Sequence, residues 1–157
     1  MSKKVLIANR GEISLRAIRA CKELGLKTVC IYSEGDKELK SLRFSDESVC
    51  VGPADPTKSY LDAPTILSAA DVTGSDAIYP GYGFLAEDHS FAEQCNLSGF
   101  KFIGPSSQTI RQMGDKITAK SIVTKYGIDG VPGYDKELPS NEAVSYTHLR
   151  AHETLNH

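Results

Sequence analysis

Short apolar runs alternate along the chain with longer segments in which apolar residues recur at helical spacing. The first run, Val5–Ala8, is typical of a parallel strand that is buried on both faces of a sheet. In the segment after it, Ile13, Ala17, Cys21 and Leu24 recur near the period of a helix. The pattern predicts a buried strand followed by an amphipathic helix.

Gly25 and the run after it complete a first structural unit. Gly25 is placed to end the helix as a left-handed residue just beyond its last turn. Thr28–Tyr32 then has the composition of a second strand. Strand, helix and strand within about thirty residues predict a βαβ unit with a right-handed crossover.

The same alternation continues to about residue 104. Residues 33–48 are charged and are expected to be irregular, and further strands are predicted at Val49–Val51, Ala77–Tyr79 and Phe102–Gly104. Asp62 is placed to cap a helix with Pro64 in its first turn, ending before Gly74. Ser90 and Glu93 have the spacing of a capping box for the next helix. The repeated alternation predicts an α/β fold, an open, Rossmann-like parallel sheet with helices on both faces.

Beyond Pro105 the alternation gives way to helices. One helix is predicted over Gln108–Met113, broken at Gly114, and a second is capped by Asp115 and ends at Gly127. The apolar face of the second is expected to contain Ala119, Ile122, Val123 and Tyr126. We therefore expect a sheet domain over residues 1–104 and a helical linker leading into a further region over 105–144, extended from Val131–Gly133 on.

The last thirteen residues differ from the rest. Three of the four histidines lie in the final ten positions, and His148 and His152 could place two metal ligands on one helix face. No third ligand is apparent, so we predict no metal site. We expect residues 145–157 to be a non-native or disordered tail, joined where the reading frame is truncated.

Composition narrows the class of protein. The chain has 157 residues, 40% of them hydrophobic, which is enough for one core of ordinary size. A formal charge of −2 does not favour nucleic acid or an anionic membrane as a partner. No apolar run approaches the roughly 20 residues of a transmembrane helix, and the amino terminus has no apolar signal segment. The expected location is the cytoplasm.

The four cysteines are scattered, with no Cys-x-x-Cys pair. We expect Cys21, Cys30, Cys50 and Cys95 to be buried, reduced thiols. Phe91, and Leu97 with it, should face inward beside Cys95, before Gly99 ends that helix.

Asn9–Glu12 follows the first strand, where ligand sites of parallel sheets gather. The segment lacks the Gly-x-Gly-x-x-Gly pattern of dinucleotide-binding proteins. It can be read as a polar turn in which Glu12 favours the helix dipole. Alternatively, Arg10, Arg16 or Glu12 contacts a ligand or a partner.

Tyr79–Glu87 is the most informative stretch. Two glycines flank Tyr82, and Pro80 restrains the backbone before them. One interpretation is a tight turn with Tyr82 as a packed surface aromatic. The other is a ligand-facing loop whose backbone amides bind a flat polar ligand while Tyr82 covers its apolar part.

Lys116 follows the Asp115 cap, in the first turn of a helix. A cation there opposes the helix dipole by about 0.3–1 kcal/mol, which is the behaviour of a solvated lysine offset by Asp115. With a phosphate bound at the helix start, amides and ammonium would instead both face an anion.

Taken together, these motifs resemble the amino-terminal portion of biotin carboxylases, the ATP-grasp components of acetyl-CoA, propionyl-CoA and pyruvate carboxylases. The matching segments keep the family's order from the start to about residue 133. They are Ile7–Ile13, Arg19–Gly25, Lys58–Leu61, Tyr79–Leu85, Phe102–Pro105 and Met113–Lys116.

The resemblance implies a pre-ATP-grasp domain and carboxylation of biotin on a carrier protein, with ATP activating bicarbonate as carboxyphosphate. It implies Mg²⁺ or Mn²⁺ as metal, and biotin carboxyl carrier protein and carboxyltransferase as partners, with a place in fatty acid biosynthesis through acetyl-CoA carboxylase. Carried over by position, Lys116 contacts ATP phosphate, Tyr82 and Gly83 line the biotin end of the cleft with Arg16 nearby, and the helix carrying Arg19 and Glu23 forms a homodimer.

The family's lid loop, metal-binding glutamates, catalytic base and arginine all lie beyond the matching region. We therefore expect no catalytic or metal-binding residue in this chain and no bicarbonate-dependent ATPase activity from it alone. Two other readings stay open at this point. One is a free-standing nucleotide-binding α/β module without catalysis, and the other is the front domain of another ATP-grasp ligase, such as a carbamoyl-phosphate or purine-biosynthetic enzyme.

Overall fold

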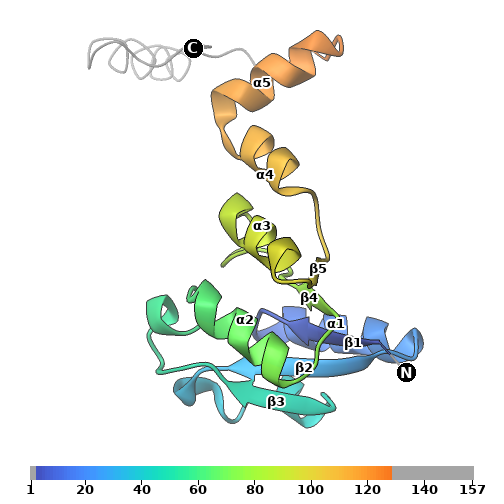
Figure 1. Ribbon diagram of the computed structural model, residues 1–157, viewed down its shortest axis with the longest axis vertical. Coiled ribbons are helices and arrows are strands. Elements are labelled where there is room, and N and C mark those ends of the chain that lie inside the picture. The colour runs from blue at the N-terminus through green and yellow to red at the C-terminus, as the bar shows by residue number, and fades with distance from the viewer. Residues whose placement is uncertain (1–2, 129–157) are drawn as a thin grey trace, which may run out of the picture. The chain divides into compact units, whose positions relative to one another are not determined.

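The computed structural model describes residues 3–128 (Figure 1). The elements of the sheet region are β1 (Lys4–Ile7), α1 (Gly11–Glu23), β2 (Lys27–Tyr32), η1 (Glu34–Asp36), η2 (Lys40–Arg43), β3 (Glu47–Cys50), η3 (Pro56–Lys58), α2 (Ala63–Val72), β4 (Ala77–Tyr79), α3 (His89–Leu97) and β5 (Lys101–Phe102), where η denotes a 3₁₀ turn. They are followed by α4 (Ser107–Gly114) and α5 (Lys116–Lys125). The chain divides into two compact units, Met1–Arg111 and Gln112–His157.

The first unit is built on a parallel sheet with the strand order β3-β2-β1-β4-β5. Its central strand β1 places Val5 opposite Thr28 of β2 and Ala77 of β4. Leu6 and Ile7 have no exposed surface. A strand covered on both faces has to be apolar at every position, which is why Val5–Ala8 is a continuous apolar run. The predicted parallel α/β fold is confirmed.

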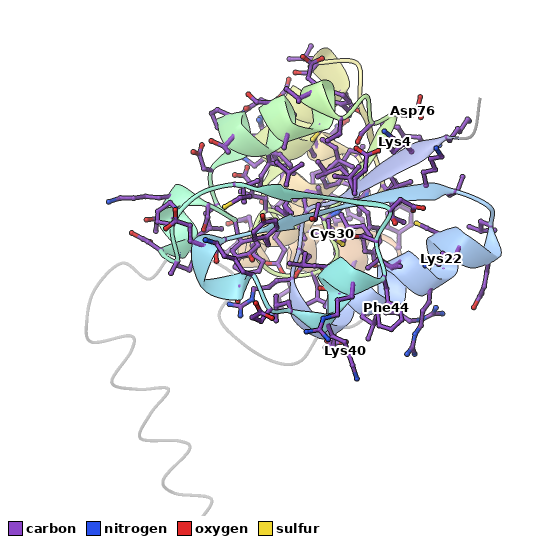
Figure 2. The ribbon with its side chains drawn as sticks, turned by 90° about the horizontal axis from the view of Figure 1, so that it is seen from below. Lys4, Lys22, Cys30, Lys40, Phe44 and Asp76 are labelled. Carbon is purple, nitrogen blue, oxygen red and sulfur yellow. The ribbon has the colours of Figure 1, made fainter. Side chains whose placement is uncertain are left out.

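Helices cover both faces of the sheet, and Figure 1 shows α2 and α1 on opposite sides of it. The larger core cluster joins Leu6 and Ala8 to side chains of α2 and α3, namely Ile66, Ala69, Ala70, Phe91, Ala92 and Cys95. Smaller clusters on the other face join Val5 and Ile7 to α1 through Ala17, Ile18 and Cys21. In Figure 2 Cys30 lies in the interior, whereas Lys22 and Lys40 lie at the periphery.

The helices of this unit end at glycines, as predicted. At the end of α1, Gly25 has a φ of 68°, its N–H donates to Lys22 O, and the N–H of Leu26 donates to Cys21 O. This pair of bonds is a Schellman motif, which needs a left-handed residue that only glycine adopts without strain. Gly74 and Gly99 end α2 and α3 with the same two bonds.

Two of the predicted helix caps differ in the structure. The capping box of Ser90 and Glu93 is wrong, because α3 begins earlier: the Asp88 carboxylate accepts the N–H of Ser90 at 2.8 Å, so Ser90 already lies inside the helix. Asp62 is at the N-cap of α2, as predicted, but its carboxylate accepts the hydroxyl of Thr65 rather than a backbone N–H.

Several predictions of strand bounds and burial are also corrected. β3 begins at Glu47 and β5 at Lys101, because polar residues of these outer strands also make ladder bonds. Cys50 is exposed, since β3 is an edge strand, whereas the other three cysteines are buried and all four thiols are free. Leu24 and Leu97 are 73% and 82% exposed, and they lie at the carboxyl ends of α1 and α3. Residues 33–48, expected to be irregular, contain the short turns η1 and η2.

The second unit contains α5, and the predicted cap is confirmed. Asp115 accepts the N–H of Thr118 at 2.7 Å, and hydrogen bonds from Thr118 lower the pKa of the Asp115 carboxyl. Helix α4 ends at Gly114, where the break was predicted, and Tyr126, expected on the apolar face of α5, is 81% exposed.

The predictions for Val131–Gly133, for the tail over residues 145–157 and for His148 and His152 lie outside the described residues. Within residues 3–128, no helix is long and apolar enough to cross a membrane.

Candidate functional site

The candidate site lies where the strand order reverses. The chain passes from β1 to β2 on one side of the sheet and from β4 to β5 on the other, so β1 and β4 are neighbours at a topological switch point. The loops after these two strands leave the same edge, and the N–H of Ala8 donates to Tyr79 O at 2.8 Å where they diverge. Open parallel sheets bind ligands in the crevice at this position.

Asn9 joins the two loops. Its side chain is buried, and its Nδ2 donates to Pro80 O and to Tyr82 O, both at 2.8 Å. Its Oδ1 accepts the N–H of Arg10 at 2.8 Å. Both hydrogens of the amide group are therefore used to hold carbonyl oxygens of the loop after β4, and the group has no unsatisfied donor.

Gly81 lies directly against this amide. Its φ is +69°, and a Cβ at this position would lie 2.9 Å from Asn9 Nδ2 and 2.6 Å from Ile13 Cγ2. Both the left-handed backbone and the close contact require glycine. Gly83 has a similar φ of +67°, but a Cβ there would meet nothing within 4 Å. Gly81 is therefore required by both its backbone conformation and its close contacts, whereas Gly83 is required by its backbone conformation alone.

The loop after β4 presents a row of backbone N–H groups. Within residues 3–128, no acceptor binds the N–H groups of Gly81, Tyr82, Gly83, Phe84 or Leu85. Tyr82 is 63% exposed and Gly83 is also exposed, so the middle of the loop lies at the surface, whereas Leu85 is buried. Successive amides in this conformation suit a carbonyl or carboxylate oxygen of a ligand.

Tyr82 is connected to α1. Its hydroxyl donates to Glu12 Oε1 at 2.5 Å, and this hydrogen bond raises the pKa of the Tyr82 phenol. Glu12 lies in the first turn of α1, where an anionic side chain also suits the helix dipole. The ring is tethered at its tip and exposed on its faces, so the interpretation of Tyr82 as a packed surface aromatic is not favoured.

Tyr60 packs against the loop after β4 from the protein interior. Its buried hydroxyl donates to Asp36 Oδ2 at 2.7 Å and accepts the N–H of Ser33 at 2.9 Å. Burial, followed by the bond to Asp36, raises the pKa of Tyr60 to about 12. Its ring stacks on Phe84 with centroids 5.2 Å apart. Tyr60 therefore links the carboxyl end of β2 to the loop after β4.

Arg10 takes part in the same network. Its Nη2 lies 2.7 Å from Asp36 Oδ1, and its guanidinium lies 5.8 Å from the centroid of the Tyr60 ring. Because Asp36 is buried, this contact supplies the charge that its carboxylate needs. The structure gives Arg10 an internal partner and thereby weakens its candidacy as a ligand contact.

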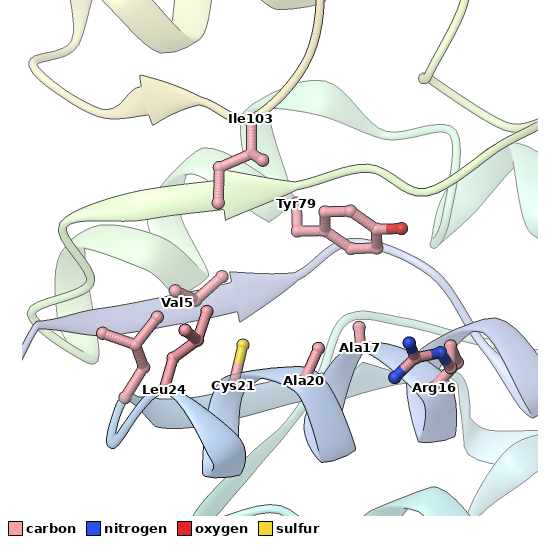
Figure 3. A pocket seen from close by; sticks show the side chains of 9 residues that line it. Val5, Arg16, Ala17, Ala20, Cys21, Leu24, Tyr79 and Ile103 are labelled. Atoms are coloured by element: carbon pink, nitrogen blue, oxygen red, sulfur yellow. The ribbon is translucent and has the colours of Figure 1, made fainter.

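Arg16 lies on α1 at one end of an apolar groove of about 310 Å³ (Figure 3). The groove runs between α1 and the strands β1 and β4, and Figure 3 shows Arg16 and the Tyr79 ring on its two sides. Its other lining residues are Val5, Ala17, Ala20, Cys21, Leu24, Leu26 and Ile103. Arg16 is one helical turn after Glu12, the partner of Tyr82, but makes no hydrogen bond to Tyr82 itself in the described part of the chain.

Lys116 is the first residue of α5, in the second unit, as the sequence predicted. Its side chain lies outside the described residues. Among those residues, no group of three or more His, Cys, Asp or Glu side chains could hold a metal ion.

The sequence had not singled out Asn9, Tyr60 or Asp36. A polar residue directly after a fully apolar strand, as Asn9 is, was the available signal. Tyr60 lies in the matching segment Lys58–Leu61, but nothing in the sequence indicated its contact with Asp36, because the two residues are 24 positions apart in a loop and a charged segment.

Comparisons with known proteins agree with this geometry. Residues 1–110 match the family described as biotin carboxylase, N-terminal domain. The biotin carboxylase of Pseudomonas aeruginosa is 58% identical over 145 residues, which make up 92% of this chain and 32% of that protein. The chain thus spans about one third of the length of such relatives.

Two solved structures extend the comparison. One is a biotin carboxylase–β,γ-ATP complex from Campylobacter jejuni, with a TM-score of 0.86 and 47% identity over 91% of this chain and 32% of that one. The other is the biotin carboxylase domain dimer of a 2-oxoglutarate carboxylase from Hydrogenobacter thermophilus, in complex with MgADP, ADP and bicarbonate. It has a TM-score of 0.87 and 44% identity over 96% of this chain and 33% of that one.

Proposed function

Since the chain belongs to the biotin carboxylase N-terminal domain family, we propose that it supplies the amino-terminal part of an ATP-dependent biotin carboxylase. In this function, ATP activates bicarbonate as carboxyphosphate, which carboxylates biotin held on a carrier protein. The sheet domain of residues 1–104 forms one wall of the cleft, and residues 105–144 lead into the ATP-grasp region.

The observation that carries this proposal is the loop at the switch point between β1 and β4. Its N–H groups over Gly81–Leu85 have no acceptor among the described residues, and the exposed aromatic ring of Tyr82 lies beside them. The ureido group of biotin is flat, with one carbonyl oxygen, and its thioether ring is apolar. Amide donors beside an aromatic face fit both parts of such a ligand.

We assign the biotin end of the cleft to Tyr82 and Gly83, with Arg16 nearby, and an ATP phosphate to Lys116. Support for Arg16 comes from its place on α1, one turn from the glutamate that holds the Tyr82 hydroxyl. Support for Lys116 comes from its position at the start of α5, where free N–H groups favour an anion.

The cofactors and partners follow from the same proposal. ATP would be bound with Mg²⁺ or Mn²⁺, whose charge assists phosphoryl transfer. Biotin would arrive on a biotin carboxyl carrier protein, and a carboxyltransferase would take the product. Arg19 and Glu23, on the exposed side of α1, would contribute to a homodimer in the cytoplasm.

We also propose that the 157-residue chain does not hydrolyse ATP on its own. The described residues contain no cluster that could bind the metal, and phosphoryl transfer needs the metal and positioned charges. ATP hydrolysis stimulated by bicarbonate, measured with the purified chain and abolished by Lys116→Ala, would contradict this.

A chimera tests the positive part of the proposal. Residues 1–110 would replace the matching residues of the Pseudomonas aeruginosa biotin carboxylase, and biotin-dependent ATP hydrolysis would be measured. We expect an active chimera in which Tyr82→Ala raises the KM for biotin by about tenfold, the effect of losing about 1.4 kcal/mol of contact.

The control is Leu97→Ala, which removes another exposed apolar side chain, at the end of α3. This control should leave the KM for biotin unchanged. A folded chimera without activity, or Tyr82→Ala with an unchanged KM, would contradict the assignment of this loop to biotin.

A further inference from the structure

We propose that Asn9 is a positioning residue that turns the N–H groups of Gly81 and Gly83 away from the interior of the protein, where acceptor oxygen atoms of a ligand can bind them. The inference rests on the proposed function, because it treats the loop after β4 as the ligand-binding segment. It goes further in naming the residue that sets the direction of the donors and the kind of ligand atom they receive.

The first step is the pairing of Asn9 with two peptide groups. The side-chain nitrogen donates to Pro80 O and Tyr82 O, which are two residues apart, at 2.8 Å each. Both carbonyl groups must therefore point toward the buried Asn9 amide.

The second step is the geometry of the peptide bond. A trans peptide group is planar, and its N–H points opposite to its C=O. The structure contains no cis peptide bond among its described residues. When Asn9 turns the carbonyls of Pro80 and Tyr82 inward, the N–H groups of Gly81 and Gly83 consequently point away from Asn9.

The third step concerns the two donors. Neither N–H has an acceptor within residues 3–128, and Gly83 and Tyr82 are exposed. Gly81 and Gly83 have similar φ values, +69° and +67°. Because the two carbonyl groups converge on Asn9 Nδ2, the two N–H groups diverge, and each can donate to a carbonyl or carboxylate oxygen of the ligand.

The residue type at position 9 is decisive. The carboxylate of Asp has no donor and would place negative oxygens against two carbonyl oxygens, which favours rotation of both peptide groups. Ala would remove the two donors without adding charge, so it should also favour rotation of the two peptide groups, but less strongly than Asp. Asn96, an exposed asparagine of α3, provides the control Asn96→Asp for the charge alone.

The test uses nuclear magnetic resonance of the 157-residue chain. In the wild-type chain, the side-chain amide of Asn9 should exchange its hydrogens with water far more slowly than that of Asn96. In folded Asn9→Asp, the backbone amide signals of Gly81 and Gly83 should move, while signals of the sheet stay in place. If both variants at position 9 unfold, the wild-type exchange rates still decide the question.

A kinetic measurement separates positioning from general support. In the chimera, Asn9→Asp should raise the KM for biotin about tenfold relative to Asn96→Asp. Rapid exchange of the Asn9 amide, or unmoved Gly81 and Gly83 signals in folded Asn9→Asp, would overturn the inference. If the Asn9 amide exchanges slowly and the glycine signals move, the positioning role of Asn9 is supported. If the chimera then shows no activity with biotin, the proposed function is contradicted while the positioning role stands.

Discussion

Replacing Gly81 by Ala tests the close contact between the two loops. The substitution forces a residue with a Cβ into a left-handed backbone conformation, which costs about 1–2 kcal/mol. It also places the Cβ 2.6 Å from Ile13 Cγ2 and 2.9 Å from Asn9 Nδ2, where real Cβ atoms are not found. Neither neighbour can move freely, because one is a branched carbon on α1 and the other is held by two hydrogen bonds.

Overpacking of this kind costs typically about 1–3 kcal/mol. The free energy of unfolding should therefore fall by about 2–5 kcal/mol in Gly81→Ala. Gly83→Ala is the matched control, because its φ is nearly the same and its Cβ would meet nothing within 4 Å. The control should lose only the backbone part, about 1–2 kcal/mol.

The assay is urea unfolding followed by far-ultraviolet circular dichroism, which suits a chain without tryptophan. The difference between the two variants isolates the contact of Gly81 with Asn9 and Ile13. Equal losses of stability in the two variants, within about 0.5 kcal/mol, would refute the reasoning about the contact.

Three further predictions concern residues around the site and the sheet. Tyr60→Phe keeps the stacked ring but leaves a buried N–H without an acceptor, so urea unfolding should show a loss of about 1–3 kcal/mol; an unchanged midpoint would contradict the network around Asp36. Hydrogen bonds from Thr28 lower the pKa of Asp46 below its ordinary value of 3.8, so the stability that they provide is present above this pH and is lost as the pH falls through the lowered pKa. Asp46→Asn should flatten the dependence of stability on pH in this acidic range, and an unaltered slope would count against the assignment. Cys50 should react rapidly with a thiol reagent in the native chain, while the buried thiols should react only on unfolding. The protected thiols are those of Cys21, Cys30 and Cys95.

Much of the fold could be predicted because its signals are local. Val5–Ala8 is apolar throughout because β1 is covered on both faces, and Gly25 ends α1 because the left-handed position is set within one turn. The edge strands were predicted less well, since β3 exposes most of its residues and loses the apolar signal. The start of α3 was missed because Asp88 and Ser90 are both good capping residues, and only the observed hydrogen bonds distinguish them.

The sequence indicated which loop forms the candidate site, but not which residue holds that loop in position. The glycines around Tyr82 marked the loop, because permissive backbone near a strand end is visible in the sequence. The residue that holds the loop was not visible, because Asn9 and its acceptors Pro80 and Tyr82 are 71 and 73 residues apart. Such contacts depend on which strands become neighbours, and the pairing of β1 with β4 follows only from the topology.

The most direct test of the account is a titration of the isotopically labelled chain with free biotin, followed through the signal of every backbone amide. The account predicts that the largest changes occur at the amides of Gly81–Leu85 and are lost in Asn9→Asp. Unchanged signals for these amides up to the solubility limit of biotin, or larger changes elsewhere, such as along the groove beside Arg16, would contradict it.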